Sequence, residues 1–164
     1  MKKLFVTVLI IMTIIENLFA QVSKDSDLFR SLKTQDSIFF ERGFNQCDIT
    51  YLENAVHPEL TFYHDQGGMQ NREVFLQRVK QNLCADANKK PIRKVDEASL
   101  EVFPLYENKI LYGVIQTGRH NFYLREPGKM DVLTSKAKFI HLYLLVNGKW
   151  LLKEVLSFDH QAEK

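Results

Sequence analysis

The second half of the chain is the feature that most constrains the fold. After the polar loop CADANKKP, four segments rich in Val, Ile, Leu, Phe and Tyr follow one another at residues 92–103, 110–125, 134–146 and 150–160. The turn signals YENK, EPGKMD and NGK separate them, and Asn-Gly in LVNGKW favours a two-residue hairpin turn. Strands joined by such short connections pair antiparallel, so the sequence predicts an antiparallel meander.

The first half predicts helices. Apolar residues recur three or four positions apart from Ser23 to Gln46, and Ser23 to Asp27 supply capping groups at its start. Asp48 opens a second helix that runs to about Val56, where His57-Pro58 ends it. Asn71 caps a third helix that runs to about Cys84. Three helices before a meander predict an α+β domain, in which a strongly bent sheet wraps around the helices.

Two local features stand out within this half. The stretch LTFYHDQGG at residues 60–68 predicts a short strand over 60–65 that ends in a Gly67-Gly68 turn. Asp36 lies four residues from both Leu32 and Phe40, so it shares the apolar face of the first helix. A buried carboxylate needs hydrogen-bond donors or has a raised pKa. A role for Asp36 as a structural hydrogen-bond acceptor is a simpler interpretation than a role in a functional site.

The N-terminal segment, residues 1–20, differs from the rest in composition. Lys2 and Lys3 precede an apolar stretch from Leu4 to Ile15, and Ala20-Gln21 offers a cleavage point, as in a secretory signal peptide. The stretch is too short to span a membrane, although an uncleaved anchor is the alternative. We therefore expect export to the periplasm or beyond, a single mature domain over residues 21–164, and no membrane attachment after cleavage.

The mature chain is close to neutral, because the whole sequence carries 22 basic and 20 acidic residues and the signal contains both kinds. The basic residues are scattered, which argues against nucleic acid as a partner. Cys47 and Cys84 are the two cysteines. In an oxidising compartment such a pair predicts a disulfide, with two buried free thiols as the alternative, and the absence of CxxC or CxxH spacing disfavours a metal site.

The order of elements resembles the nuclear-transport-factor-2-like superfamily, also called cystatin-like or ketosteroid-isomerase-like. GFNQCD, FYHDQGG, IQTGRHNFY, KAKFIHLY and VLSFDHQ are similar to an exported bacterial branch of unknown function related to the SnoaL-type polyketide cyclases. The resemblance implies a cone-shaped α+β fold, a ligand pocket at its open end, and homodimers in many relatives. It implies no catalytic residue, because members include enzymes, binding proteins and association domains.

Strand alternation selects candidate pocket residues. In the 110–125 strand, Gln116 and His120 share the more apolar face, whereas both faces of the next strand around His141 are apolar. If the last strand is regular, His160 shares a face with Leu152, Leu156 and Phe158, opposite Asp159. The candidate pocket residues are Tyr63, His64, Asp65, Gln116, His120, His141, Asp159 and His160.

These residues allow three functions. The first is a binding domain for a small organic molecule, and the second is a lyase, isomerase or hydrolase that needs no cofactor and uses His120 or His160 as base with Tyr63 or Asp65 as partner. The third is a protein-interaction module. A histidine hydrogen-bonded to a carboxylate inside the pocket would favour catalysis. We expect no cofactor and no metal, since no two histidines have ligand spacing and no phosphate-binding loop is present.

Overall fold

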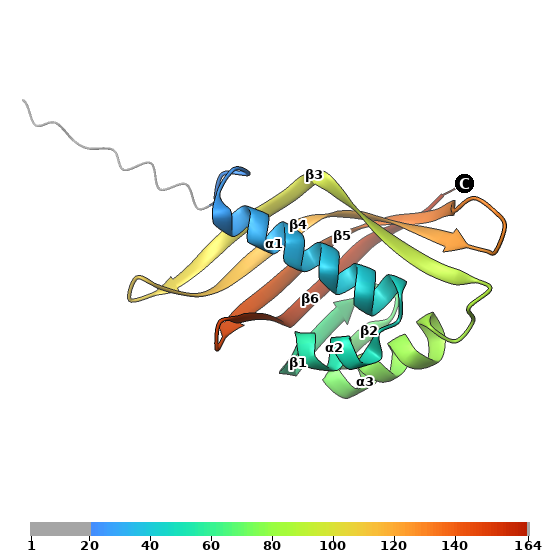
Figure 1. The fold of residues 1–164 in the computed structure, drawn as a ribbon, viewed down its shortest axis with the longest axis horizontal. Coiled ribbons are helices and arrows are strands. Elements are labelled where there is room, and N and C mark those ends of the chain that lie inside the picture. The colour runs from blue at the N-terminus through green and yellow to red at the C-terminus, as the bar shows by residue number, and fades with distance from the viewer. Residues whose placement is uncertain (1–20, 164) are drawn as a thin grey trace, which may run out of the picture.

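The computed structural model describes residues 21–163, so the predicted signal peptide lies outside the described residues. Helices and strands follow in the predicted order (Figure 1). The helical segments are α1 (Asp27–Ile38), η1 (Phe39–Asn45), α2 (Ile49–Ala55), α3 (Arg72–Arg78) and η2 (Val79–Leu83). The strands are β1 (Val56–His64), β2 (Gly68–Asn71), β3 (Lys90–Glu107), β4 (Ile110–Arg125), β5 (Val132–Val146) and β6 (Lys149–Ala162). Among residues 21–163, no helix is both long and apolar enough to cross a membrane.

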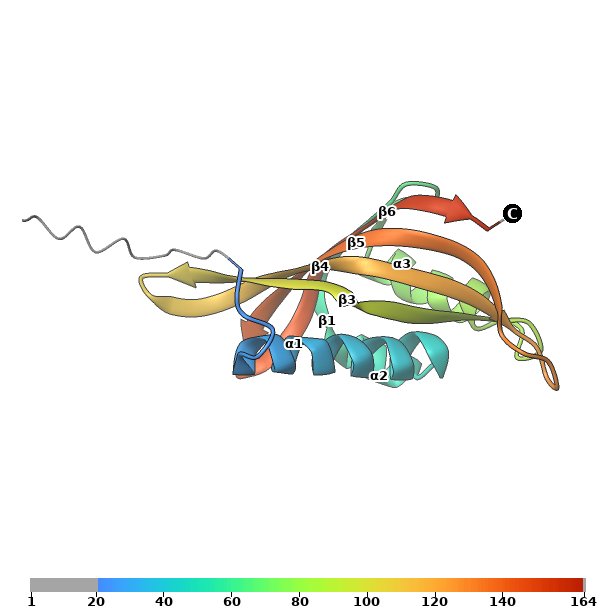
Figure 2. The same cartoon turned by 90° about the horizontal axis from the view of Figure 1, so that it is seen from above.

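The sheet has six strands in the order β2-β1-β6-β5-β4-β3. The β1/β6 pair is parallel and the other pairs are antiparallel, which confirms the predicted meander and places the first strand beside the last. α1 and α2 lie on one side of this sheet, and the long strands β4 and β5 bend over them (Figure 2). The predicted α+β fold, with three helices on a mostly antiparallel sheet, is therefore confirmed.

Side-chain caps define where the helices begin. Ser26 accepts from the backbone N–H of Phe29 and starts α1, Asp48 accepts from that of Tyr51 and starts α2, and Asn71 accepts from that of Val74 and starts α3. The first helix was predicted from Ser23 but starts at Asp27. Both α1 and α3 continue into a π-helical segment. β1 begins at Val56 and includes Pro58, which is tolerated because the pairing with β6 is irregular between Val56 and Thr61.

The core lies between the helices and the inner face of the sheet. Leu32 and Phe39 from the helical layer pack there against Val102, Val114 and other buried strand residues. In β4, Val114, Gln116 and His120 are buried, as alternation predicts. The same inner face of β5 carries Ala137, Phe139, His141 and Tyr143.

Strand β6 is not regular, and this corrects the predicted assignment of its faces. Two shifts in its pairing with β5, one opposite Leu142/Tyr143 and one opposite Lys136/Lys138, each place one extra residue on β6. Asp159, in the second bulge, has a positive φ of 60°. Each extra residue reverses the alternation that follows it. The inner face of β6 therefore carries Leu152, Val155, Ser157 and His160, whereas Leu156 and Phe158 are on the outer face.

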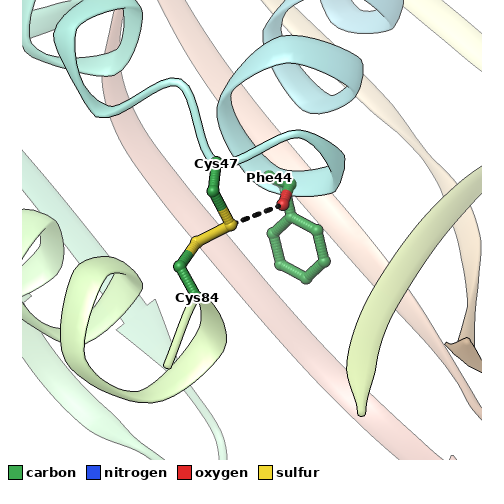
Figure 3. The surroundings of a disulfide bond; sticks show 3 residues. All are labelled: Phe44, Cys47 and Cys84. Atoms are coloured by element: carbon green, nitrogen blue, oxygen red, sulfur yellow. Dashed lines mark hydrogen bonds between the residues drawn. A yellow bond between two sulfur atoms is a disulfide. The ribbon is translucent and has the colours of Figure 1, made fainter. Parts of the chain in front are cut away.

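Cys47 and Cys84 form a disulfide, as the sequence predicts (Figure 3). The bond joins the turn after η1 to the residue that follows η2, so it links the end of the α1–η1 helix to the end of the α3–η2 helix. Cys47 Sγ also contacts the carbonyl oxygen of Phe44 at 3.7 Å. Both helical segments that the disulfide joins contribute side chains to the cavity described next.

Candidate active site

A cavity of about 450 Å³ opens between the helical segments and the inner face of the sheet. Its wall is mainly aromatic, with Phe39, Phe40, Phe44, Phe62, Phe75 and Phe122 among the lining residues. Four histidines also line it, namely His64, His120, His141 and His160. An apolar cavity of this size with a few convergent polar groups is typical of a site for a small organic molecule.

His160, in this wall, is hydrogen-bonded through its backbone and through both ring nitrogens. Its ring Nδ1 lies 2.6 Å from Asp65 Oδ1, and its backbone N–H donates to Asp65 Oδ2 at 3.1 Å. A carboxylate only accepts, so Nδ1 carries the proton and the lone pair of Nε2 is free to act as a base. Nε2 lies 3.4 Å from the hydroxyl of Ser157, which also lines the cavity.

Asp65 remains ionised in this arrangement. Burial on its own would raise the pKa of Asp65, but the backbone N–H and the ring of His160, with His64 nearby, together hold that pKa below its usual value. The carboxylate is therefore available to orient the imidazole of His160 and to stabilise it when it takes up a proton.

His64 supports the ring of His160 from one side. The two rings are stacked, with centroids 4.3 Å apart and planes 16° from parallel. His64 Nδ1 accepts from the backbone N–H groups of Gln66 and Gly67, so it carries no proton, and its 3.3 Å approach to Asp65 is not an ion pair. Burial, followed by the nearby His160, lowers the pKa of His64. His64 is thus a neutral ring that positions His160.

The donor atoms of His64, Asp65 and His160 lie within 4.8 Å of one another, close enough to be considered as a metal site. Their orientation does not fit one. Nδ1 of each ring already has a hydrogen-bond partner, and the near-parallel rings do not aim their in-plane lone pairs at a common point. The donor set suits an Asp–His proton-transfer pair better than it suits a cation.

A buried ion pair lies beneath the cavity. Nη1 and Nη2 of Arg93 donate to the carboxylate of Asp36, at 2.7 and 3.1 Å, and the two side chains are 1% and 0% exposed. Arg93 Nε also donates to His120 Nδ1 at 3.0 Å. Because Arg93 can only donate, His120 is fixed as the tautomer with its proton on Nε2, an atom that is buried with no partner among the described residues. Burial, then Arg93, lowers the pKa of His120 to about 2.

His141 lies next to this pair and is also neutral. Its ring stacks on Phe139 with centroids 4.3 Å apart, and its Nδ1 lies 3.7 Å from Asp36, too far for a hydrogen bond. Burial, followed by Arg93 and His120, places the pKa of His141 well below its ordinary value. Asp36 is thus a structural acceptor for Arg93, which agrees with the simpler interpretation of its position in the sequence.

No protein-family model matches this sequence, and no curated protein matches it. Solved structures do resemble it. ActVI-ORFA from Streptomyces coelicolor is similar with a TM-score of 0.68 at 11% identity, over 83% of this chain and 98% of that one. A nuclear transport factor 2-like superfamily protein from Salmonella enterica serovar Typhimurium is similar with a TM-score of 0.61 at 12% identity, over 82% and 90% of the two chains.

The chain has the nuclear-transport-factor-2-like fold. A protein with a cystatin-like fold from Nostoc punctiforme agrees, with a TM-score of 0.57 at 13% identity over 84% of this chain and 93% of that one. This confirms the fold that the sequence motifs indicate. Identities this low carry the fold alone, so the function of this nuclear-transport-factor-2-like domain is argued from its cavity.

The predicted pocket residues of this nuclear-transport-factor-2-like domain fall into three groups. His64, His120, His141 and His160 line the cavity, and Asp65 lies behind His160. Gln116 is fully buried and donates to the carbonyl oxygen of Leu32, away from the cavity. Tyr63 and Asp159 form the third group and lie outside the cavity.

Tyr63 and Asp159 differ from the prediction. Tyr63 is 44% exposed on the outer face of the sheet, because His64 takes the inner face. Asp159 is exposed and forms an ion pair with Lys138 at 2.9 Å, because the bulge in β6 turns it outward and His160 inward. Neither residue lines the cavity of the nuclear-transport-factor-2-like fold.

Two polar residues that contact the predicted histidines, Arg93 and Ser157, were not identified from the sequence. Arg93 lies in PIRKV, where nothing distinguishes it from the exposed Lys94 that follows it. Ser157 stands on the predicted outer face of the last strand, and only the first bulge in β6 brings it to the inner face. The buried position of Asp36 did predict that a donor must lie opposite it, which was the available signal for Arg93.

Proposed function

We propose that this domain binds a small, mostly apolar organic molecule in its cavity and acts on it by acid–base chemistry, with His160 as the base. The hydrogen bond of 2.6 Å between His160 Nδ1 and Asp65 carries the proposal. It leaves Nε2 as an acceptor in the cavity wall, beside a carboxylate that offsets the charge of the protonated ring. The aromatic lining supplies the low-dielectric surroundings in which such a base is effective.

A proton-transfer probe tests this without knowledge of the natural substrate. 5-Nitrobenzisoxazole is a small aromatic molecule that loses a C–H proton to a base while its N–O bond breaks, giving a coloured cyanophenolate. We expect His160→Gln to lower kcat/KM for this ring opening by about 100-fold, which is within the usual contribution of a positioned base. We expect Asp65→Asn to lower it by about tenfold, because the imidazole loses its orienting carboxylate.

A histidine outside the cavity provides the matched control. His57 accepts from the backbone N–H of Glu59 and does not line the cavity, so His57→Gln should leave the rate unchanged. Equal rates in wild type and His160→Gln would reject His160 as the base. In that case binding without catalysis becomes the better account of the cavity.

We also propose that the mature domain is exported. The charged and apolar start of the sequence supports this, and the disulfide fits an oxidising compartment. Fractionation of cells that express the full chain tests it: the protein should be recovered outside the cytoplasm and should begin near Gln21. An intact N-terminus in the cytoplasmic fraction would contradict export.

We also propose that the outer face of the sheet binds a second copy of this chain, because many relatives of this fold form homodimers. Tyr63 pairs in register with Leu156, Leu156 with Ile140, and Phe158 with Lys138, which makes one patch with three exposed large side chains. We expect a dimer by light scattering and a monomer for Leu156→Glu. If wild type is a monomer at high concentration, this face has another role.

A further inference from the structure

Ser157 has a position that binding alone does not require. Its side chain is on the inner face of β6, the residue is 5% exposed, and it lines the cavity. The one hydrogen bond of its hydroxyl within residues 21–163 is to His160 Nε2, at 3.4 Å. The opposite ring nitrogen of His160 is hydrogen-bonded to Asp65. A hydroxyl, an imidazole and a carboxylate are therefore connected in one line.

We propose that Ser157 is a nucleophile, activated by His160 and Asp65, and that the domain transfers acyl groups. This deepens the proposed function, since it names the hydroxyl of Ser157 as the group from which His160 removes a proton. The three side chains are arranged as in an activated serine nucleophile, because the base contacts the hydroxyl through one ring nitrogen and the orienting carboxylate through the other. The separation of 3.4 Å is longer than the roughly 2.6–3.2 Å of an activated pair, and such contacts are often longer before substrate binds.

Local structure holds the three groups in place. The backbone N–H of Asp65 donates to the carbonyl oxygen of Ser157, and the backbone N–H of His160 donates to the carboxylate of Asp65. His64 stacks on the His160 ring and keeps its plane fixed. The strand end after β1 and the bulge in β6 are thus tied together at the point where the three side chains meet.

The reaction balances without a cofactor. Ser157 Oγ attacks the carbonyl carbon of an ester while its proton passes to His160 Nε2, and the tetrahedral intermediate expels the alcohol, which takes that proton. Water then attacks the acyl-serine, again giving its proton to His160, and the carboxylic acid leaves as the hydroxyl of Ser157 is restored. Asp65 stays ionised throughout and offsets the charge of the protonated ring.

The cavity defines the class of substrate. A volume of about 450 Å³ and a wall of six phenylalanines suit an ester with a compact aromatic or other apolar acyl group. Arg78 and Asn82 are the lining residues on the α3 side that offer hydrogen-bond donors. A polymer or a highly charged substrate would not be matched by this lining.

The test uses covalent labelling of the mature, oxidised protein by phenylmethylsulfonyl fluoride, whose benzyl group is apolar and whose fluoride leaves when a serine attacks sulfur. Peptide mass spectrometry should find the sulfonyl group on Ser157. Labelling should be lost in Ser157→Ala and slowed about tenfold or more in His160→Gln and in Asp65→Asn. Ser31 is exposed on α1 and does not line the cavity, so Ser31→Ala should label like wild type.

Two results would overturn the proposal: no label on Ser157 in a folded protein, or labelling that is equally fast in His160→Gln. The ring opening of 5-nitrobenzisoxazole separates this failure from that of the proposed function, because it needs the base and not the hydroxyl. If Ser157→Ala still opens the ring at the wild-type rate while wild type takes no label, His160 is a base and Ser157 is not a nucleophile. If the ring opening is also independent of His160, both proposals fail.

Discussion

Mild acid should destabilise this protein well above the pH at which its carboxylates titrate. His120 and His141 are 3% and 1% exposed and lie beside the guanidinium of Arg93. Burial and Arg93 lower the pKa of His120 to about 2, and they lower that of His141 well below its ordinary value. Both rings therefore stay neutral in the folded protein at pH 5, whereas both are protonated in the unfolded chain, in which the pKa of histidine is about 6.5.

The direction of the effect follows from proton uptake. Below about pH 6.5 the unfolded chain binds protons that the folded protein does not, so stability is fully present above that pH and is lost as the pH falls toward the folded pKa. Between pH 7 and pH 5, each such histidine costs about 2 kcal/mol, so the pair costs about 4 kcal/mol. That is a large part of the roughly 5–15 kcal/mol that a small domain has in total.

The charged and titratable groups around these two rings do not reverse the predicted loss of stability in acid. Arg93, His64 and His160 face His120, and all three disfavour its protonation. Asp36 approaches His141 at 3.7 Å, but its charge is already paired with Arg93. His64 adds to the loss in the same direction, because burial lowers its pKa as well.

The assay is the free energy of unfolding in urea at pH 7, 6 and 5, with the disulfide intact. We expect His120→Gln and His141→Gln each to remove about half of the pH dependence, since each deletes one titrating ring. His57→Gln should leave the dependence as in wild type, because His57 lies outside the core cluster. A free energy that is constant from pH 7 to pH 5 would refute the claim that these rings are buried and neutral.

Three further predictions concern the stability of the folded protein. Cys47→Ser should lower the free energy of unfolding by about 4 kcal/mol, because the disulfide closes a loop with a sequence separation of 37 residues, and no change would show that the loop is ordered without the bond. Arg93→Met should lower the free energy of unfolding by about 3–5 kcal/mol, since it leaves Asp36 buried and unpaired. Adding Asp36→Leu should recover part of this loss, and additive losses from the two substitutions would contradict the pairing. Zinc should leave the melting temperature at pH 7 unchanged, and a rise that requires His64 would show that the cluster with Asp65 does bind metal.

The sequence predicted most of the fold because the dominant signals were local and mutually consistent. Ser26, Asp48 and Asn71 cap helices that tertiary packing then extends, and Asn147-Gly148 closes the hairpin between β5 and β6. The short strand β2 was missed because it starts at Gly68, directly after the turn at residues 65–67, and pairs with the end of β1. Nothing within four residues distinguishes such a strand from an extended loop.

The site was only partly predictable, and the reason is specific to β6. In a regular strand, Ser157 and His160 lie on opposite faces, since they are three residues apart. The bulge at Asp159 inserts one residue between them and brings both to the cavity, while the earlier bulge sets which face that is. Alternation can identify inner residues only where the register is continuous, as it is with β5 between Gly113 and Phe122 of β4, where it selected His120. The two irregularities that defeat the sequence pattern are thus the same ones that assemble Asp65, His160 and Ser157.

If these bulges serve the site rather than the fold, replacing Asp159 by glycine, which accepts its positive φ, should preserve labelling of Ser157. Deleting Asp159 should restore alternation, turn His160 away from Asp65 and abolish labelling in a protein that still folds. Labelling that survives the deletion would show that the three residues meet for another reason.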